Sequence, residues 1–215
     1  MTQVKICGLK TMAALDAALD GGADYVGLVF FAPSPRNLKL QDAAALAGHA
    51  RGRAQIVALV VDADDATLAA ILDDVAPDWL QLHGEESPER VAEIKRRIGL
   101  PVIKAVPVAT EADAQRAFDY AGIADLILFD AKAPKGSVLP GGNGGTFDWS
   151  MLDGVKDQIP FMLSGGLNPE NVADAIAATG ASAVDVSSGV ESAPGVKDTE
   201  LIRRFLEAVK GAAAG

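Results

Sequence analysis

Cys7, the only cysteine in the chain, ends the short apolar run VKIC and precedes a glycine. Lys5 lies two positions earlier, so in an extended strand both side chains point to the same face. An ammonium group beside a thiol favours the thiolate, which is a stronger base and nucleophile than the thiol. A lone cysteine is also often an unreactive, buried apolar residue. Its position at a strand end favours a reactive role for Cys7.

Asp130 ends a second apolar run, LILFD, and is followed by the long irregular segment 131–146. A carboxyl group shielded by that segment could keep a proton and act as a general acid. A solvated turn residue is the alternative. In the catalytic interpretation, Cys7 and Asp130 form a base and acid pair from opposite parts of the fold.

Three other polar residues are candidates for substrate binding. Arg36 follows two prolines in FFAPSPRNL, and a guanidinium on such a restricted loop could bind a carboxylate bidentately. His83 in LQLHG could donate a hydrogen bond to a substrate or simply end a strand. Asp185 in VDVSS could accept a hydrogen bond from a substrate NH or OH, or belong to a buried polar network.

Two glycine- and serine-rich segments, LSGGLNPENV (163–172) and VDVSSGVE (184–191), predict a phosphate site. Gly165 and Gly166 allow backbone amides to approach an anion closely, while Ser187, Ser188 and Gly189 add hydroxyl and amide donors. A helix N-terminus would add favourable partial charge without Lys or Arg.

These candidates lie in a repeated pattern of apolar runs and alanine-rich stretches of helical period, which is typical of strand–helix units around a parallel sheet. Eight strands are predicted, at residues 4–7, 24–30, 55–61, 78–83, 101–108, 125–130, 160–163 and 183–187. Helices are predicted at 11–22, 41–50, 65–75, 87–99, 110–122, 168–180 and 198–211, with a shorter one at 147–152.

Eight such units without a visible linker indicate an α/β protein whose residues 1–215 form one (β/α)8 barrel with eight parallel strands. In this fold the active site lies at the carboxyl ends of the strands. The candidate residues all follow or end predicted strands, so we expect them at one rim of the barrel.

The composition of the chain argues against several classes of function. A net charge of −10 opposes general attraction to nucleic acid or an anionic membrane. No secretory signal or long apolar span is visible, and one cysteine with two histidines is too sparse for structural zinc. We therefore expect a cytoplasmic enzyme acting on a small phosphorylated molecule without metal or cofactor, as a monomer or a homodimer.

The ordered motifs KICGL, SPR, QLHG, FDAK, GGNGGTFDW, LSGGLNPENV and VDVSSGVE, the last followed by PGVKD, resemble the phosphoribosylanthranilate isomerase family of tryptophan biosynthesis. The resemblance runs from residue 4 to about residue 198. It implies a (β/α)8 barrel, with the general base at Cys7, the general acid at Asp130 and the carboxylate-binding arginine at Arg36. The segment before FDW is richer in glycine than the usual family form, and Gly144 and Gly145 are the better phosphate-binding candidates there.

The resemblance implies an Amadori rearrangement of N-(5'-phosphoribosyl)anthranilate to 1-(2-carboxyphenylamino)-1-deoxyribulose 5-phosphate, an aldose–ketose isomerisation. Asp130 would protonate the ribose ring oxygen, and the Cys7 thiolate would then remove the proton from C2'. Two alternatives stay open from the sequence: a related phosphosugar isomerase or synthase, or a barrel that binds a phosphorylated ligand without catalysis.

Overall fold

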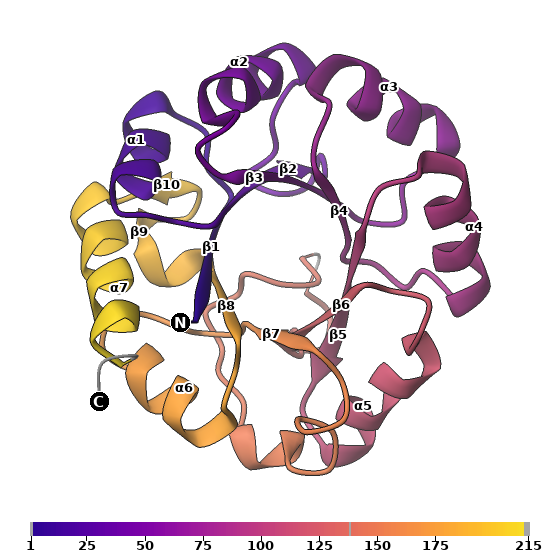
Figure 1. Cartoon of the computed structure of the whole chain (residues 1–215), viewed down its shortest axis with the longest axis vertical. Coiled ribbons are helices and arrows are strands. Elements are labelled where there is room, and N and C mark those ends of the chain that lie inside the picture. The colour runs from indigo at the N-terminus through magenta and orange to yellow at the C-terminus, as the bar shows by residue number, and fades with distance from the viewer. Residues whose placement is uncertain (1, 138, 213–215) are drawn as a thin grey trace.

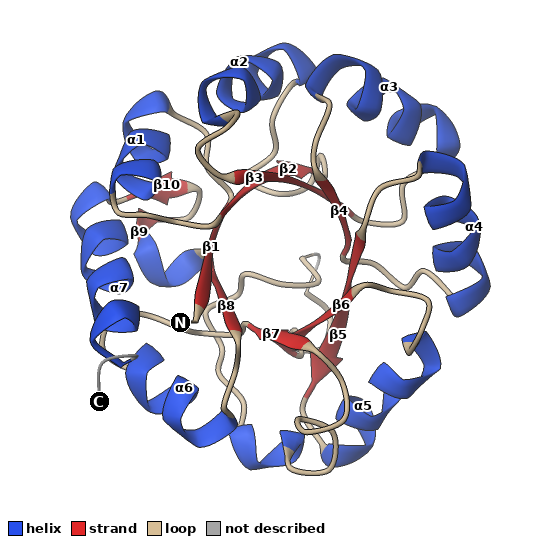
Figure 2. Cartoon of the chain, in the orientation of Figure 1, coloured by secondary structure: helices blue, strands red, loops and turns tan. Residues whose placement is uncertain are grey.

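The computed structural model of the chain describes residues 2–137 and 139–212. Eight parallel strands pair in sequence order, and the last pairs with the first to close a barrel. The helices form an outer ring around these strands (Figures 1 and 2). The strands are β1 (Gln3–Cys7), β2 (Tyr25–Phe30), β3 (Gln55–Val60), β4 (Trp79–Leu82), β5 (Val102–Val108), β6 (Leu126–Ala131), β7 (Phe161–Leu163) and β8 (Ala183–Val186). The predicted (β/α)8 architecture is confirmed.

The helices follow the predicted order with two differences. The α-helices are α1 (Met12–Asp20), α2 (Leu40–Ala50), α3 (Asp65–Val75), α4 (Pro88–Ile98), α5 (Glu111–Gln115), α6 (Val172–Thr179) and α7 (Thr199–Ala212). One α-helix was predicted at 110–122, but only its first part is α-helical, as α5. The chain then continues as the 3-10 helix η1 (Arg116–Tyr120), so the predicted helix type is wrong there. The segment predicted at 147–152 is likewise one 3-10 turn, η2 (Trp149–Leu152). Neither is long or apolar enough to cross a membrane, and nor is any other helix within the described ranges.

Three elements after β8 were not predicted. A single 3-10 turn, η3 (Ser188–Val190), leads into a small antiparallel hairpin of β9 (Glu191–Ala193) and β10 (Val196–Lys197). This hairpin precedes α7 and lies outside the barrel sheet. It places the last part of the VDVSSGVE motif and the PGVKD segment next to the end of β8.

Side chains alternate between two cores along each strand, as the period of a strand requires. On β1, Val4 and Ile6 belong to the main apolar core that includes the helices. Lys5 and Cys7 point the other way, into the barrel, as predicted. Cys7 packs there with Val29 and Leu59, so an apolar layer closes the barrel interior beneath the carboxyl rim.

Candidate active site

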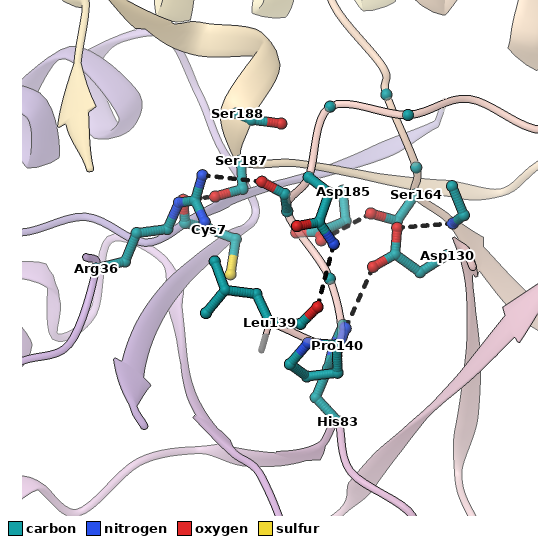
Figure 3. Close-up of a pocket in the computed structure, with 18 of the residues that line it drawn as sticks. Cys7, Arg36, His83, Asp130, Leu139, Pro140, Ser164, Asp185, Ser187 and Ser188 are labelled. Carbon is teal, nitrogen blue, oxygen red and sulfur yellow. Dashed lines mark hydrogen bonds and ion pairs between the residues drawn. The ribbon is translucent and has the colours of Figure 1, made fainter. Parts of the chain in front are cut away.

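A pocket opens at the carboxyl ends of the strands, where the sequence places the candidate residues. Figure 3 shows side chains from strand ends far apart in the sequence turned toward it. The pocket is lined by eleven of the twelve predicted site residues: Cys7, Arg36, His83, Asp130, Gly144, Gly145, Gly165, Gly166, Asp185, Ser187 and Ser188. Gly189 is absent from the lining, although it lies in the same turn after β8.

Cys7 is almost fully buried, with 4% of its surface exposed. Burial raises the pKa of its thiol, while the nearby Lys5 ammonium lowers it and Asp185 raises it again. The sequence analysis correctly expected Lys5 to favour the Cys7 thiolate, but it did not identify the partner of Lys5. Lys5 Nζ donates to Asp185 Oδ1 at 2.9 Å. With its charge balanced by this ion pair, Lys5 does not outweigh the burial of the thiol.

Asp185 is a member of a buried polar network, which was one of its two predicted roles. Besides Lys5, its carboxylate accepts a hydrogen bond from the Ser164 hydroxyl at 3.2 Å. Asp185 lies two residues before Ser187 and only 4% of its surface is exposed. Its negative charge is therefore held in the barrel by Lys5 and lies deeper than the serine turn.

Asp130 ends β6 and carries the second candidate catalytic group. Its Oδ1 accepts from the Ala131 amide at 2.9 Å, and its Oδ2 lies 3.2 Å from His83 Nε2. The Gln81 amide nitrogen lies 2.9 Å from His83 Nδ1. Because an amide nitrogen only donates, Nδ1 accepts in this arrangement and Nε2 donates to Asp130. The Gln81–His83–Asp130 chain thus fixes the carboxyl group at the pocket wall, and Gln81 was not predicted.

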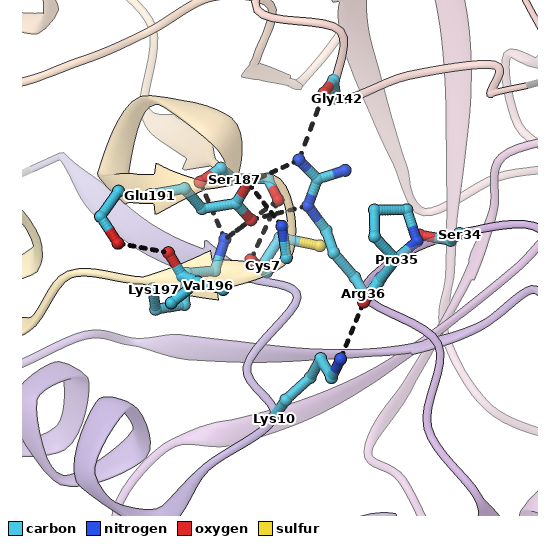
Figure 4. Close-up of polar contacts among 12 residues, drawn as sticks. Cys7, Lys10, Ser34, Pro35, Arg36, Gly142, Ser187, Glu191, Val196 and Lys197 are labelled. Atoms are coloured by element: carbon cyan, nitrogen blue, oxygen red, sulfur yellow. Dashed lines mark hydrogen bonds and ion pairs between the residues drawn. The ribbon is translucent and has the colours of Figure 1, made fainter.

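Arg36 is held by a residue that sequence reasoning missed. Its Nε and Nη2 donate to the two carboxylate oxygens of Glu191 on β9, at 2.7 and 2.8 Å, as Figure 4 shows. Nη2 also donates to the Gly142 carbonyl at 3.2 Å. Burial lowers the pKa of Arg36, but the hydrogen bonds and charge of Glu191 outweigh it, and the net pKa is raised. Nη1 has no hydrogen-bond partner among the described residues, so this edge of the guanidinium is available to a carboxylate in the pocket.

The predicted phosphate-binding segments come together after β7 and β8. Gly165, at φ +90°, is required to be glycine because a Cβ there would lie 2.5 Å from the Ala131 amide nitrogen. Within the described residues, the amides of Gly165, Gly166 and Ser188 donate no hydrogen bond to the protein. These amides and the Ser188 hydroxyl can therefore receive an anion at the rim without a neighbouring lysine or arginine.

Ser187 has a different position from Ser188. Its hydroxyl donates to the Cys7 carbonyl at 3.2 Å and accepts from Lys197 Nζ at 3.1 Å. These contacts use the Ser187 side chain to connect β1, β8 and β10. Lys197 was not among the predicted site residues, although it lies in the PGVKD segment that carries part of the family resemblance.

Gly189 provides a test of how the turn after β8 is built. A Cβ at this position would lie 1.8 Å from the Leu167 carbonyl oxygen, so Gly189→Ala should force the two phosphate-binding turns apart. We expect a loss of about 1–3 kcal/mol in the free energy of unfolding and weaker binding of inorganic phosphate, measured by thermal unfolding and calorimetry. Gly145→Ala is the matched control for stability, because a Cβ there meets nothing within 4 Å. Unchanged stability and phosphate affinity in Gly189→Ala would contradict this role.

The loop between β6 and η2 lies directly over the acid and the arginine, and two of its glycines were not predicted. A Cβ on Gly141 would lie 2.4 Å from Asp130 Oδ2 and 2.5 Å from His83 Nε2. A Cβ on Gly142 would lie 2.6 Å from Arg36 Nη1. The described part of segment 131–146 therefore shields Asp130, as the sequence interpretation expected, and glycine is the residue type that permits this approach.

No group of three or more His, Cys, Asp or Glu side chains among residues 2–137 and 139–212 is placed to hold a metal ion. The arrangement instead offers a thiol and a carboxyl group facing one pocket, a free guanidinium edge and a set of free backbone amides. It can move protons on a ligand that carries both a carboxylate and a phosphate.

Comparison with known proteins gives a consistent result. A family model described as N-(5'phosphoribosyl)anthranilate (PRA) isomerase matches residues 4–208. The N-(5'-phosphoribosyl)anthranilate isomerase of Rhodopseudomonas palustris (strain BisA53) is 63% identical over 207 residues, which cover 96% of this chain and 95% of the relative.

Solved structures agree over nearly the whole chain. The crystal structure of phosphoribosyl anthranilate isomerase from Thermotoga maritima has a TM-score of 0.89 at 38% identity, covering 98% of this chain and 100% of that one. A phosphoribosyl anthranilate isomerase in complex with reduced 1-(o-carboxyphenylamino)-1-deoxyribulose 5-phosphate has a TM-score of 0.86 at 36% identity, with the same coverage.

Proposed function

The chain belongs to the N-(5'-phosphoribosyl)anthranilate isomerase family, and we propose that Cys7 is the general base and Asp130 the general acid of its isomerase reaction. The enzyme converts N-(5'-phosphoribosyl)anthranilate to 1-(2-carboxyphenylamino)-1-deoxyribulose 5-phosphate in tryptophan synthesis. The observation that carries the proposal is that the Cys7 and Asp130 side chains, from β1 and β6, line the same pocket.

The two groups act in succession. Asp130 gives its proton to the ribose ring oxygen, the ring opens, and the substrate nitrogen becomes part of an iminium ion. The Cys7 thiolate removes the proton from C2' and becomes a neutral thiol, while the C–H electron pair moves toward the iminium nitrogen. The enolamine then tautomerises to the ketone. Because the substrate's own nitrogen acts as the electron sink, we propose that no metal or cofactor takes part. We also propose that the enzyme works in the cytoplasm.

Binding at the two ends of the substrate holds the reacting carbon between these groups. The free Nη1 edge of Arg36 receives the anthranilate carboxylate by a charge-assisted hydrogen bond. The amides of Gly165, Gly166 and Ser188 receive the phosphate, with Gly144 and Gly145 from the covering loop beside them. Fixing both ends lowers the entropy that must be lost on reaching the transition state.

Two other functions were open from the sequence. A histidine-pathway aminoaldose isomerase has an aspartate where this chain has Cys7 in KICGL, and an indole-glycerol-phosphate synthase carries a different lysine and glutamate set. A barrel without catalysis would have no need to retain both Cys7 and Asp130. The family match and the pocket geometry favour the isomerase over both.

Arg36→Met tests how the substrate is recognised. We expect about 10- to 100-fold weaker binding of reduced 1-(2-carboxyphenylamino)-1-deoxyribulose 5-phosphate, since a hydrogen bond to a charged group contributes about 1.5–3 kcal/mol. The measurement is Kd by calorimetry for this compound and for its analogue without the carboxyl group. The Kd of the carboxyl-free analogue should change little. An equal loss for both compounds would show that Arg36 supports the pocket but does not recognise the carboxylate.

A further inference from the structure

Two groups of buried charges surround Cys7, and they do not carry the same net charge. On one side, Lys5 on β1 and Asp185 on β8 form a one-to-one ion pair at 2.9 Å. On the other side, Glu191 accepts from both Arg36 at 2.7 Å and Lys197 at 2.8 Å. One carboxylate between two cations leaves a net positive charge in the second group.

Lys197 is the cation of that group whose charge is least compensated. Glu191 gives both carboxylate oxygens to Arg36, while Lys197 shares only Oε1. The other two hydrogen bonds of Lys197 Nζ go to neutral oxygens of Ser187, the carbonyl at 2.8 Å and the hydroxyl at 3.1 Å.

The same contacts hold Lys197 beside Cys7. The Ser187 hydroxyl that accepts from Lys197 donates in turn to the Cys7 carbonyl at 3.2 Å. In Figure 4 the Lys197 side chain extends from β10 toward Cys7 and Ser187. The side chain of Lys197 is 2% exposed, so water screens its charge poorly and its field at the thiol is strong.

The ionisation of the two residues is coupled in the expected direction. Burial lowers the pKa of Lys197 and outweighs Glu191 and Cys7, which both raise it, so the net pKa is lowered. Burial raises the pKa of Cys7, and Lys197 lowers it together with Lys5. Since Asp185 offsets Lys5, the positive charge without a full counterion lies at Lys197.

We propose that Lys197 supplies the uncompensated positive charge that stabilises the Cys7 thiolate, and that it is a positioning residue for proton abstraction from C2'. The proposal rests on the assignment of Cys7 as general base. Lys197 keeps its own proton throughout: the proton from C2' ends on the Cys7 sulfur, and the proton from Asp130 ends on the ribose oxygen. Family membership and the known reaction do not require this role.

The chain's single cysteine allows a direct test. The rate of Cys7 alkylation by iodoacetamide, measured against pH, reports on thiolate formation at this residue alone. Lys197→Met should move the midpoint of this profile to higher pH and slow alkylation at pH 7 by about tenfold or more, the order of effect of an opposite charge near a thiol. The kcat of the isomerase should fall with it. Lys197→Arg keeps the charge and should restore most of both.

A matched control is available on the far side of the barrel. Lys104 on β5 also has a side chain that is 2% exposed and is paired with a glutamate, Glu86, at 2.8 Å. Lys104→Met removes an equally buried lysine but leaves the charges around Cys7 unchanged, so the midpoint should stay at the wild-type pH. Loss of structure cannot mimic the expected result for Lys197→Met, because unfolding would expose Cys7 and speed its alkylation.

Glu191→Gln gives a test of opposite sign that does not depend on the folding of the lysine variants. It removes a negative charge from the same group, so the midpoint should move to lower pH. An unchanged midpoint in Lys197→Met, or a midpoint that rises in Glu191→Gln, overturns the proposal. If both midpoints move as expected while kcat stays at the wild-type value, Lys197 controls the thiolate but the assignment of Cys7 as base is wrong.

Discussion

Replacing Cys7 by alanine should lower kcat by about 10²- to 10⁴-fold, the range that a positioned general base contributes. Without the thiolate, the proton on C2' must be taken by water in a pocket whose wall is apolar at this point, formed by Val29 and Leu59. The measurement is steady-state turnover of N-(5'-phosphoribosyl)anthranilate. Cys7→Ser should be almost as slow, because a serine hydroxyl is a far weaker acid than a thiol and yields little of the anionic base.

In Cys7→Ala, ligand affinity distinguishes loss of the catalytic base from disruption of the binding site. Cys7 contributes only its carbonyl to the hydrogen bond with Ser187, and alanine retains that group. The Kd of reduced 1-(2-carboxyphenylamino)-1-deoxyribulose 5-phosphate should therefore stay within about threefold of wild type, a difference of less than about 1 kcal/mol. A kcat near the wild-type value in Cys7→Ala would remove this residue from its role.

Strand periodicity accounts for what could be predicted about the site. Alternation on β1 places Lys5 and Cys7 on one face, and the barrel brings each strand end to one rim, so residues 123 positions apart such as Cys7 and Asp130 could be paired in advance. Glycine pairs after the last two strands likewise indicated the anion site. These inferences need only local patterns and the geometry of the fold.

The contacts between charged side chains could not be predicted in the same way. The Lys5–Asp185 pair joins residues 180 positions apart and the Arg36–Glu191 pair joins residues 155 apart. Their partners depend on strand register and on the hairpin β9–β10, whose strands have only three and two residues. So short a hairpin leaves no alternating pattern in the sequence. For Lys5 the missing information was the register between β1 and β8, which sets Lys5 opposite Asp185. Without that register, Lys5 was given a stronger influence on Cys7 than its ion pair permits.

The helix predicted at 110–122 shows a second limit of prediction from the sequence. Its first turn has a capping box between Thr110 and Asp113, as a helix start should. The chain nevertheless tightens from residue 116 onward, and Tyr120 is buried with its hydroxyl donating to the Glu86 carbonyl at 2.9 Å. A tertiary contact therefore accompanies a change in helix type that local propensity does not indicate.

Replacing Asp130 by asparagine should also lower kcat by about 10²- to 10⁴-fold, because the amide keeps the shape of the carboxyl group but has no acidic proton for the ribose ring oxygen. Without that proton the ring-opening step must expel an alkoxide. The contacts that hold the side chain are largely kept, since an amide oxygen can accept from the Ala131 amide or from His83 as the carboxylate does at 2.9 and 3.2 Å. Thermal unfolding and the Kd of the reduced product analogue should show a folded enzyme that still binds.

His83→Asn distinguishes the acid from the residue that orients it. His83 Nε2 donates to Asp130 Oδ2 at 3.2 Å, and this hydrogen bond stabilises the carboxylate that remains once the proton has left. Its loss should lower kcat by about 10- to 100-fold, since a hydrogen bond to a charged group contributes about 1.5–3 kcal/mol. In the double variant His83→Asn/Asp130→Asn, kcat should be no lower than in Asp130→Asn alone, because His83 acts on the reaction only through the Asp130 carboxylate. Independent, multiplicative losses would place His83 in direct contact with the substrate and separate it from Asp130.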